Sequence, residues 1–215
     1  MFPGSNCDSD CKHALNKIDG FKVSMLWHKE VKIPDKTDLV ILPGGFSYGD
    51  YLRCGAIAAK SPIMSAVNDF YLKGGFILGI CNGFQVLTET NILPGALITN
   101  RNQKFICKEE EIIVQNSNTV FTSLYENNQN ISYPIAHHDG QYFIDKNGLS
   151  ELIDEERIAF KYKNNPNGSI DNIAGILSQN KRVLGLMPHP ERAIDKDIGN
   201  TSGIKLFKSL LQIIR

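Results

Sequence analysis

The sequence lacks the features that mark membrane proteins and nucleic-acid-binding proteins. Its longest apolar stretches, such as residues 76–81 and 131–136, are far shorter than the roughly 20 residues that a membrane-spanning helix needs. The 23 Lys and Arg residues balance the 23 Asp and Glu residues, and like charges form no long run. We therefore expect neither a membrane nor a nucleic acid among its partners.

Cysteine is scarce and odd in number, which argues against a disulfide framework and favours free thiols. Cys7 and Cys11 are four residues apart, but no second Cys or His pair follows at the spacing of a zinc site, so no metal is predicted. The first residues carry neither a basic region nor an apolar core, so we expect no signal peptide and a cytoplasmic protein. The cysteines are Cys7, Cys11, Cys54, Cys81 and Cys107.

The length of 215 residues predicts a single domain over residues 1–215. Short apolar strands alternate with amphipathic helices, which favours an α/β fold with an open, mostly parallel twisted sheet and helices on both faces. Shorter segments between residues 97 and 144 predict a small antiparallel β excursion. The predicted helices span residues 8–18, 64–72, 84–90 and 203–214. The predicted strands span residues 21–27, 39–42, 76–80, 104–107, 111–114, 131–135, 173–177 and 183–187.

The most informative stretch surrounds Cys81. This cysteine follows the predicted strand 76–80, precedes a predicted helix, and has Gly79 and Gly83 two residues to either side. The pattern is typical of a nucleophile elbow, a crowded strand-to-helix turn that exposes a reactive side chain. The helix dipole favours a thiolate at this position, and the N–H of Asn82 would point to where an oxyanion forms. A buried core cysteine at a strand end is the alternative interpretation.

A thiolate nucleophile needs a proton carrier, and His189 is the best placed of the five histidines. Pro188 and Pro190 stiffen the chain around it. In an extended chain, residues two apart face the same side, so Glu191 can reach the His189 ring. Cys81, His189 and Glu191 are therefore predicted to form a catalytic triad in which Glu191 orients the imidazole. A surface turn with an incidental ion pair is the alternative.

Gly44 and Gly45 follow the predicted strand 39–42. Functional sites in parallel sheets gather at the carboxyl ends of strands, and glycine lets backbone N–H groups approach a substrate closely. Either glycine could therefore supply a second oxyanion donor. A plain turn after a strand is the alternative.

Residues 79–85, Gly-Ile-Cys-Asn-Gly-Phe-Gln, together with His189-Pro190-Glu191 resemble the paired signature of the triad-type glutamine amidotransferases. Blocks at residues 3–8, 43–56, 167–169 and 187–192 narrow the resemblance to glutaminase subunits of a small multi-subunit enzyme of purine biosynthesis. The resemblance implies a flavodoxin-like sheet, glutamine as substrate, and a synthetase subunit and a small accessory subunit as partners. It implies no cofactor in this chain, with ATP and magnesium on the synthetase, where ammonia would convert formylglycinamide ribonucleotide to the amidine.

Carried over residue by residue, the resemblance assigns a role to each candidate. Cys81 becomes the nucleophile, His189 the general base and acid, and Glu191 its partner. The further candidates would bind substrate: Gly44, Gly45 and Asn82 as oxyanion donors, Gln85 as a lining residue of the glutamine pocket, and His137 as part of a loop that holds glutamine.

Two departures from the family pattern stand out. The loop that usually reads His-Gly-Glu-Gly is His137-His138-Asp139-Gly140 here, which puts any side-chain role of positions 138 and 139 in question. The family also begins with a short apolar strand, whereas only Met1 and Phe2 precede Pro3 in this chain. The second departure has two interpretations: either the start of the sequence is truncated, or the first strand is nearly absent, which would leave a gap in the sheet.

Two other functions compete with this interpretation. A stand-alone cysteine hydrolase with the same elbow would need an open cleft and no partner. A non-catalytic binding or scaffold module is disfavoured because Cys81, His189 and Glu191 are all present, whereas such relatives typically lose one of them. A flavin-binding or nucleotide-binding protein is weaker still, because no phosphate-cradling glycine pattern follows the first strand.

Overall fold

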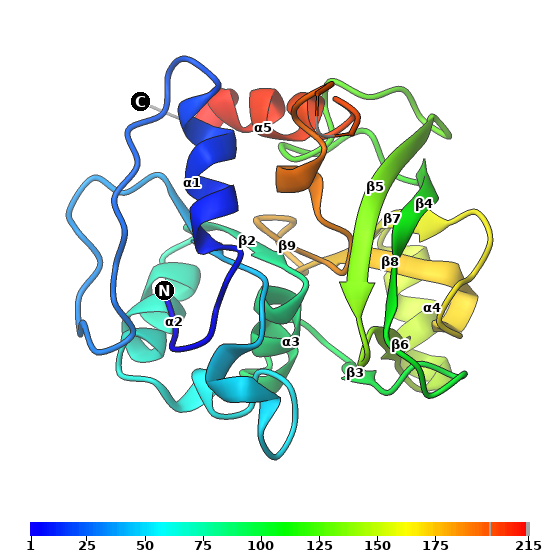
Figure 1. The fold of residues 1–215 in the computed structure, drawn as a ribbon, viewed down its shortest axis with the longest axis horizontal. Helices are drawn as coiled ribbons and strands as arrows, with labels where there is room; N and C mark the ends of the chain where they lie inside the picture. Colours follow the sequence, from blue (N-terminus) through cyan, green and yellow to red (C-terminus); the bar gives the residue numbers. More distant parts are fainter. Residues whose placement is uncertain (198, 214–215) are drawn as a thin grey trace.

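The computed structural model describes residues 1–197 and 199–213. Its centre is a seven-stranded sheet in the order β1-β2-β9-β8-β7-β4-β5 (Figure 1). The strands of this sheet are β1 (Leu39–Leu42), β2 (Phe76–Ile80), β4 (Ile106–Val114), β5 (Asn130–His137), β7 (Ile158–Tyr162), β8 (Ile173–Leu177) and β9 (Val183–Leu186). A second, two-stranded sheet pairs β3 (Ala96–Ile98) with β6 (Gln141–Phe143).

The α/β class is confirmed, and the sheet is mixed. The parallel pairing that the sequence predicts holds for β1, β2 and β9. The remaining neighbours pair in antiparallel fashion, so the antiparallel part is larger than the small excursion expected. The physical reason is local: β8 and β9 are joined by a short turn at residues 178–182, and a turn of this length can only join antiparallel strands.

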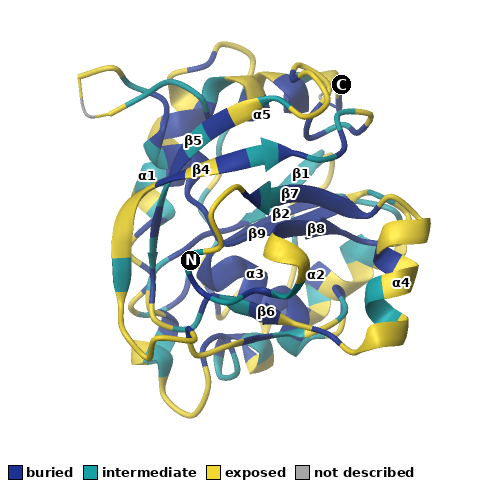
Figure 2. Ribbon diagram, turned by 90° about the vertical axis from the view of Figure 1, so that its right-hand side faces the viewer, coloured by how far each residue is buried: buried dark blue, intermediate teal, exposed yellow. Residues whose placement is uncertain are grey.

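Helices cover both faces of the sheet, as expected. Both views place α2 and α3 below the central strands and α1 and α5 above them, and the strands between are almost entirely buried (Figures 1 and 2). In the part of the chain that the structure describes, no helix combines the length and apolar character needed to cross a bilayer. The helices are α1 (Asp8–Asn16), α2 (Ile63–Leu72), α3 (Asn82–Glu89), α4 (Lys146–Asp154) and α5 (Ile204–Leu210).

Several element boundaries differ from the sequence prediction. Helix α4 and strand β7 were not predicted, and β4 is a single strand where two shorter segments were expected. The predicted helix 203–214 is α5 followed by a short 3-10 helix (Leu211–Ile213), and Ile214 lies outside the described residues.

The predicted strand 21–27 is wrong, because these residues form no strand. Alternation alone does not make a strand, since the backbone needs a paired neighbour. Among the described residues, no strand pairs with the outer edge of β1. Phe2 is buried, and the Met1 amino group donates a hydrogen bond to the carbonyl oxygen of Leu26 at 2.6 Å, so the chain start lies beside this unpaired segment.

Candidate active site

Cys81 lies in the turn between β2 and α3 and has a strained backbone. Its φ of 50° and ψ of −106° are rare for a residue with a Cβ. The turn is held by hydrogen bonds: the Cys81 N–H donates to the Leu186 carbonyl at 2.7 Å, and the Cys81 carbonyl accepts from the N–H of Phe84 at 2.9 Å. The structure therefore has the nucleophile elbow that the sequence predicts.

The glycines that flank the elbow are required by close packing. A Cβ on Gly83 would overlap the backbone of Leu42 at the end of β1, and a Cβ on Gly79 would overlap the side chain of Leu87 on α3. Neither glycine has a positive φ, so space rather than conformation demands glycine at both positions. Helix α3 can therefore lie directly against the strands that present Cys81.

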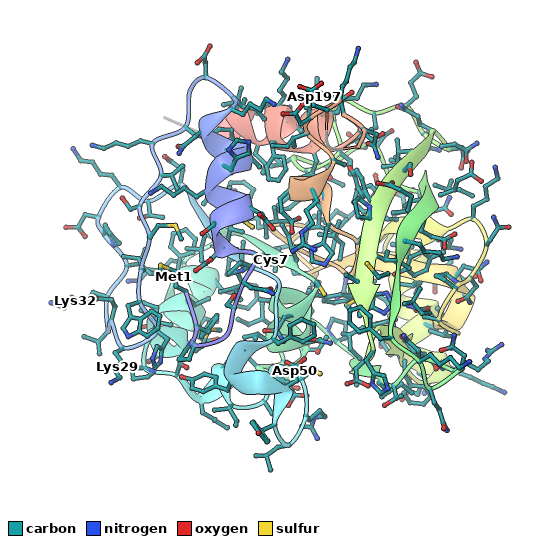
Figure 3. All side chains as sticks on the ribbon, viewed as in Figure 1. Met1, Cys7, Lys29, Lys32, Asp50 and Asp197 are labelled. Atoms are coloured by element: carbon teal, nitrogen blue, oxygen red, sulfur yellow. The ribbon has the colours of Figure 1, made fainter. Side chains whose placement is uncertain are left out.

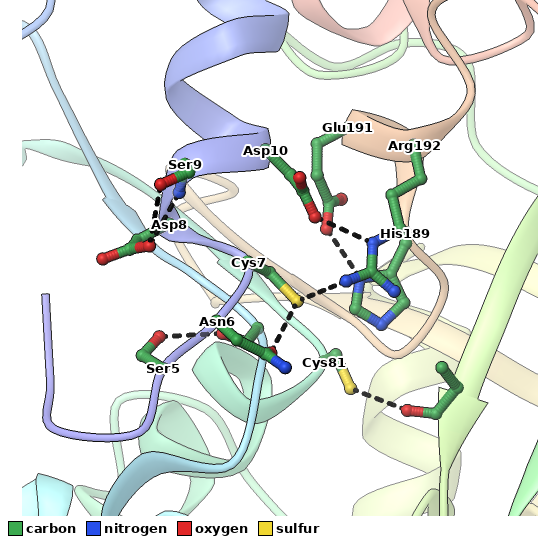
Figure 4. A network of polar contacts seen from close by, with 12 residues as sticks. Ser5, Asn6, Cys7, Asp8, Ser9, Asp10, Cys81, His189, Glu191 and Arg192 are labelled. Atoms are coloured by element: carbon green, nitrogen blue, oxygen red, sulfur yellow. Dashed lines mark hydrogen bonds and ion pairs between the residues drawn. The ribbon is translucent and has the colours of Figure 1, made fainter. Parts of the chain in front are cut away.

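His189 and Glu191 come together beside Cys81, as predicted (Figure 4). The Nδ1 atom of His189 lies 2.6 Å from Oε1 of Glu191, and both side chains are almost fully buried. The contact arises in a different way from the one predicted, because residues Pro190–Arg192 form a 3-10 helix rather than extended chain. The His189 N–H donates to the Pro134 carbonyl at 2.8 Å, which ties this turn to β5.

The charge environment favours a protonated His189. Burial by itself lowers the pKa of an imidazole, but the Glu191 carboxylate, followed by Cys81, outweighs it, so the pKa of His189 lies well above its ordinary value. The Nε2 atom of His189 has no hydrogen-bond partner among the described residues. An imidazolium next to Cys81 with a free N–H has what a general acid needs.

Gly44 lies where these side chains converge. A Cβ on Gly44 would lie 2.8 Å from Cε1 of His189 and 3.3 Å from Cβ of Cys81. A larger residue would therefore displace the catalytic candidates. The Ser5 hydroxyl donates to the Gly44 carbonyl at 2.8 Å, and Gly45 has a φ of 114° with its Cα against the backbone of Asn6. The carbonyl of Gly44 is thereby fixed. The Gly45 N–H belongs to the same planar peptide unit and points the opposite way, so its direction is fixed as well.

The Asn82 and Gln85 side chains connect α3 to the loop 137–140. The Asn82 amide donates to Oε1 of Gln85 at 2.8 Å, and Gln85 in turn donates to the carbonyl of Asp139 at 2.7 Å. Both polar ends of Gln85 are therefore occupied by protein. Gln85 shapes this side of the site by fixing the loop, and the backbone N–H of Asn82 remains at the start of α3, where the first N–H groups have no partner within the helix.

Two buried asparagines that sequence reasoning did not assign hold the same loop from the other side. Oδ1 of Asn100 accepts from the N–H of Gly140 at 3.1 Å and lies 3.1 Å from Nδ1 of His137. The Asn167 amide donates to the Gly140 carbonyl at 2.8 Å. The only signal in the sequence was the Asn167-Gly168-Ser169 block of the family pattern, and Asn100 had none. Residues 137–140 are thus rigidly positioned.

The unusual residues His138 and Asp139 have a structural explanation. Oδ1 of Asp139 contacts Nδ1 of His138 at 3.0 Å, and Oδ2 accepts from the thiol of Cys54 at 3.1 Å. Burial raises the pKa of Asp139, but hydrogen bonds from Thr99, Cys54 and His138 outweigh it and lower the pKa. Asp139 therefore stays ionised, and its carboxylate anchors the loop to the segment after β1.

Access to Cys81 is narrow. Its side chain is buried, with an exposed fraction of 5%. A cavity of about 610 Å³ is lined by Arg101 and His138 and not by Cys81. The buried thiol disfavours the open cleft that a general hydrolase or peptidase would need.

The buried imidazole of His137 should make the free energy of unfolding fall at acidic pH. Burial, followed by the charge of His189, lowers the pKa of His137 to about 4, while the unfolded chain has an ordinary value near 6.5. Between these values the unfolded chain binds a proton that the folded chain does not, so stability falls as the pH falls through this window. Relative to His137→Gln, the unaltered chain should lose about 2 kcal/mol of unfolding free energy between pH 7 and pH 5, measured by urea denaturation. Equal losses in the two proteins would contradict the prediction.

A mixed α/β sheet that presents a cysteine elbow against a buried His–Glu pair defines the class of triad glutamine amidotransferases. Residues 1–204 match the family model of the CobB/CobQ-like glutamine amidotransferase domain. This chain belongs to that family and, within it, to the PurQ subunits of phosphoribosylformylglycinamidine synthase.

Relatives of that name are similar over nearly the whole chain. The phosphoribosylformylglycinamidine synthase subunit PurQ of Ruegeria pomeroyi is 58% identical over 210 residues, which are 98% of this chain and 94% of the relative. The Zymomonas mobilis subunit of the same name is 51% identical over 214 residues, 100% of this chain and 97% of the relative. A chain in the structure of PurLQS from Thermotoga maritima superposes with a TM-score of 0.91 at 44% identity, covering 100% of this chain and 96% of that one.

Proposed function

We propose that Cys81, His189 and Glu191 hydrolyse the side-chain amide of glutamine. The Cys81 thiolate attacks the amide carbon and forms a C–S bond, and the carbonyl oxygen becomes an oxyanion. His189 donates its Nε2 proton to the leaving nitrogen, the C–N bond breaks, and ammonia departs from a γ-glutamyl thioester. A water molecule, deprotonated by His189, then attacks the thioester and releases glutamate and the Cys81 thiolate. Glu191 holds the imidazole in position throughout.

One observation carries this mechanism: a strained cysteine at a helix N-terminus faces a buried imidazole whose other nitrogen contacts a carboxylate at 2.6 Å. The N–H groups of Asn82 and of Gly44 or Gly45 would stabilise the oxyanion. The loop 137–140, fixed by Gln85, Asn100 and Asn167, would bind the glutamine backbone through peptide groups. We assign pocket roles to His137 and Gln85 through this loop. Both polar ends of Gln85 are occupied by protein, whereas Nε2 of His137 has no hydrogen-bond partner among the described residues.

The chain is the glutaminase subunit of phosphoribosylformylglycinamidine synthase in purine biosynthesis. It associates with PurL-type and PurS-type subunits, as in the Thermotoga maritima PurLQS structure. We propose that its ammonia converts formylglycinamide ribonucleotide to formylglycinamidine ribonucleotide on the synthetase subunit, which would bind ATP and magnesium. The proposed hydrolysis needs only protein groups. Because all five cysteines are free thiols, we place the chain in the cytoplasm.

A glutamine-mimicking electrophile tests the role of Cys81 directly. Incubation of the electrophile with the full chain in its complex should yield one covalent adduct, found on the Cys81 peptide by mass spectrometry. Excess glutamine should slow the labelling, because substrate and electrophile compete for one site. A matched Cys107→Ser variant, which removes the exposed cysteine, should be labelled normally. Labelling elsewhere, or none at Cys81, would overturn the proposed function.

A further inference from the structure

A second thiol lies at the catalytic cluster. Cys7 is the residue before α1 (Figure 3), far from Cys81 in sequence, and its side chain is buried. A Cβ on Gly44 would lie 3.4 Å from Sγ of Cys7 as well as beside His189 and Cys81. The ligand atoms of Cys7, His189 and Glu191 all lie within 4.8 Å of one another, and all three residues are buried. The proposed triad does not use this thiol.

One oxygen of this cluster has unused bonding capacity. Oε2 of Glu191 is buried and finds no hydrogen-bond partner among the residues described. A buried carboxylate oxygen without a partner is costly, and a cation is one way of satisfying it. Thiolate, imidazole and carboxylate are together the donor set that zinc prefers. The cluster therefore has the chemistry and the spacing of a three-ligand site.

Arg192 holds Cys7 beside His189 and Glu191. Its guanidinium donates to Sγ of Cys7 at 3.0 Å and to Oδ2 of Asp10 at 3.0 Å (Figure 4). The Arg192 side chain is 35% exposed, so its charged end can turn toward solvent when a cation arrives. Asp10 then remains nearby as a negative charge.

We propose that Cys7, His189 and Glu191 form a binding site for Zn²⁺, and that zinc bound there stops the glutaminase reaction. Binding displaces the proton shared by His189 and Glu191 and the proton of any neutral Cys7 thiol, and both protons pass to solvent. The metal then binds Nδ1 of His189 and draws the Glu191 carboxylate away from the ring. The imidazole keeps only its Nε2 proton, and giving that proton up would leave an imidazolate. His189 is then too weak an acid to protonate the leaving ammonia, and it has no free lone pair with which to deprotonate water. The inhibition rests on the proposed function, whereas the binding site does not.

Cobalt is a spectroscopic probe for this site, because Co²⁺ takes zinc ligands and shows a sulfur-to-metal charge-transfer band when a thiolate binds it. Titration of the full chain with Co²⁺ should produce this band with one metal per chain. Cys7→Ser should lose the band, whereas Cys81→Ala should keep it. Cys11→Ser and Cys107→Ser are matched controls that should also keep it, and melting curves check that each variant folds. A band that depends on Cys81 and not on Cys7, or no band at all, would overturn the site.

Inhibition is measured separately on the assembled complex. Zn²⁺ should abolish glutamate release from glutamine, and a chelator should restore it. Each variant is compared with its own zinc-free rate, so a lower basal rate does not disturb the comparison. Cys7→Ser should raise the zinc concentration for half-inhibition by at least about 100-fold, because loss of a ligand exceeds the effect of losing an outer-shell partner. An unchanged sensitivity would overturn the regulatory part, and a failed glutaminase function would appear as no glutamate release even without zinc.

Discussion

Replacing Cys81 with Ala will abolish glutamine-dependent synthesis in the assembled complex and leave ammonia-dependent synthesis intact. Without the Cys81 thiol no thioester can form, so the rate with glutamine should fall by about 10⁴-fold or more, as expected when a covalent nucleophile is lost. Ammonia supplied in the buffer bypasses this site and reaches the synthetase directly. The measurement is the formation of formylglycinamidine ribonucleotide with either nitrogen source, at a pH where free ammonia is present.

Comparing the glutamine-dependent rate with the ammonia-dependent rate distinguishes loss of glutamine hydrolysis from loss of the assembled complex. Cys107→Ala, at an exposed position, should leave both rates unchanged. If Cys81→Ala removed the ammonia-dependent rate as well, the division of work between the two subunits would be wrong. If it removed neither, Cys81 would not be the nucleophile. Mass measurement of the complex confirms that the variant still binds its partners.

The sequence predicted the central parallel strands and the elbow because those signals are local. A continuous apolar run predicts a strand from its own residues, and β1 and β2 are both of this kind. Strand β7 and helix α4 were not predicted, although both carry a local signal. Four of the five residues of β7 are apolar, and the Asp145 side chain caps α4 by accepting from the N–H of Gly148. The prediction for residues 21–27 was wrong because an alternating pattern is not sufficient. Within the described chain these residues have no partner strand to pair with.

The same distinction explains which parts of the site could be predicted. His189 and Glu191 are two residues apart, so their contact needs only one turn of chain, and Cys81 has its glycines beside it. Asn100 and Asn167 are 67 positions apart in the numbering and meet only at Gly140, which no periodicity reveals. Cys7 was expected to be an ordinary thiol for the same reason. Its neighbours in the fold, His189 and Arg192, lie at the other end of the sequence.

The close packing of α3 against β1 near Cys81 predicts how a substitution at Gly83 changes the stability of the chain. Gly83 is the second residue of α3, and alanine is intrinsically a better helix former than glycine by about 1 kcal/mol. Propensity alone would therefore predict that Gly83→Ala stabilises the chain. The structure predicts the reverse, because the added methyl group would overlap the carbonyl oxygen, the carbonyl carbon and the Cβ of Leu42. Backbone atoms of a buried strand cannot move aside as a flexible side chain can.

Gly83→Ala should lower the free energy of unfolding by about 2 to 3 kcal/mol, the scale of overpacking in a close-packed interior. It should also lower glutamine-dependent activity by about 100-fold, because α3 carries Cys81 and β1 leads into Gly44, so pushing them apart misaligns nucleophile and oxyanion donor. Gly199→Ala is the matched control, since the nearest atom to its added Cβ is 3.8 Å away, and it should change neither quantity. Urea unfolding of the isolated chain and the glutamine-dependent rate of the complex provide the two measurements. A Gly83→Ala chain that is more stable and fully active would show that α3 does not need its close approach to β1 to position the nucleophile.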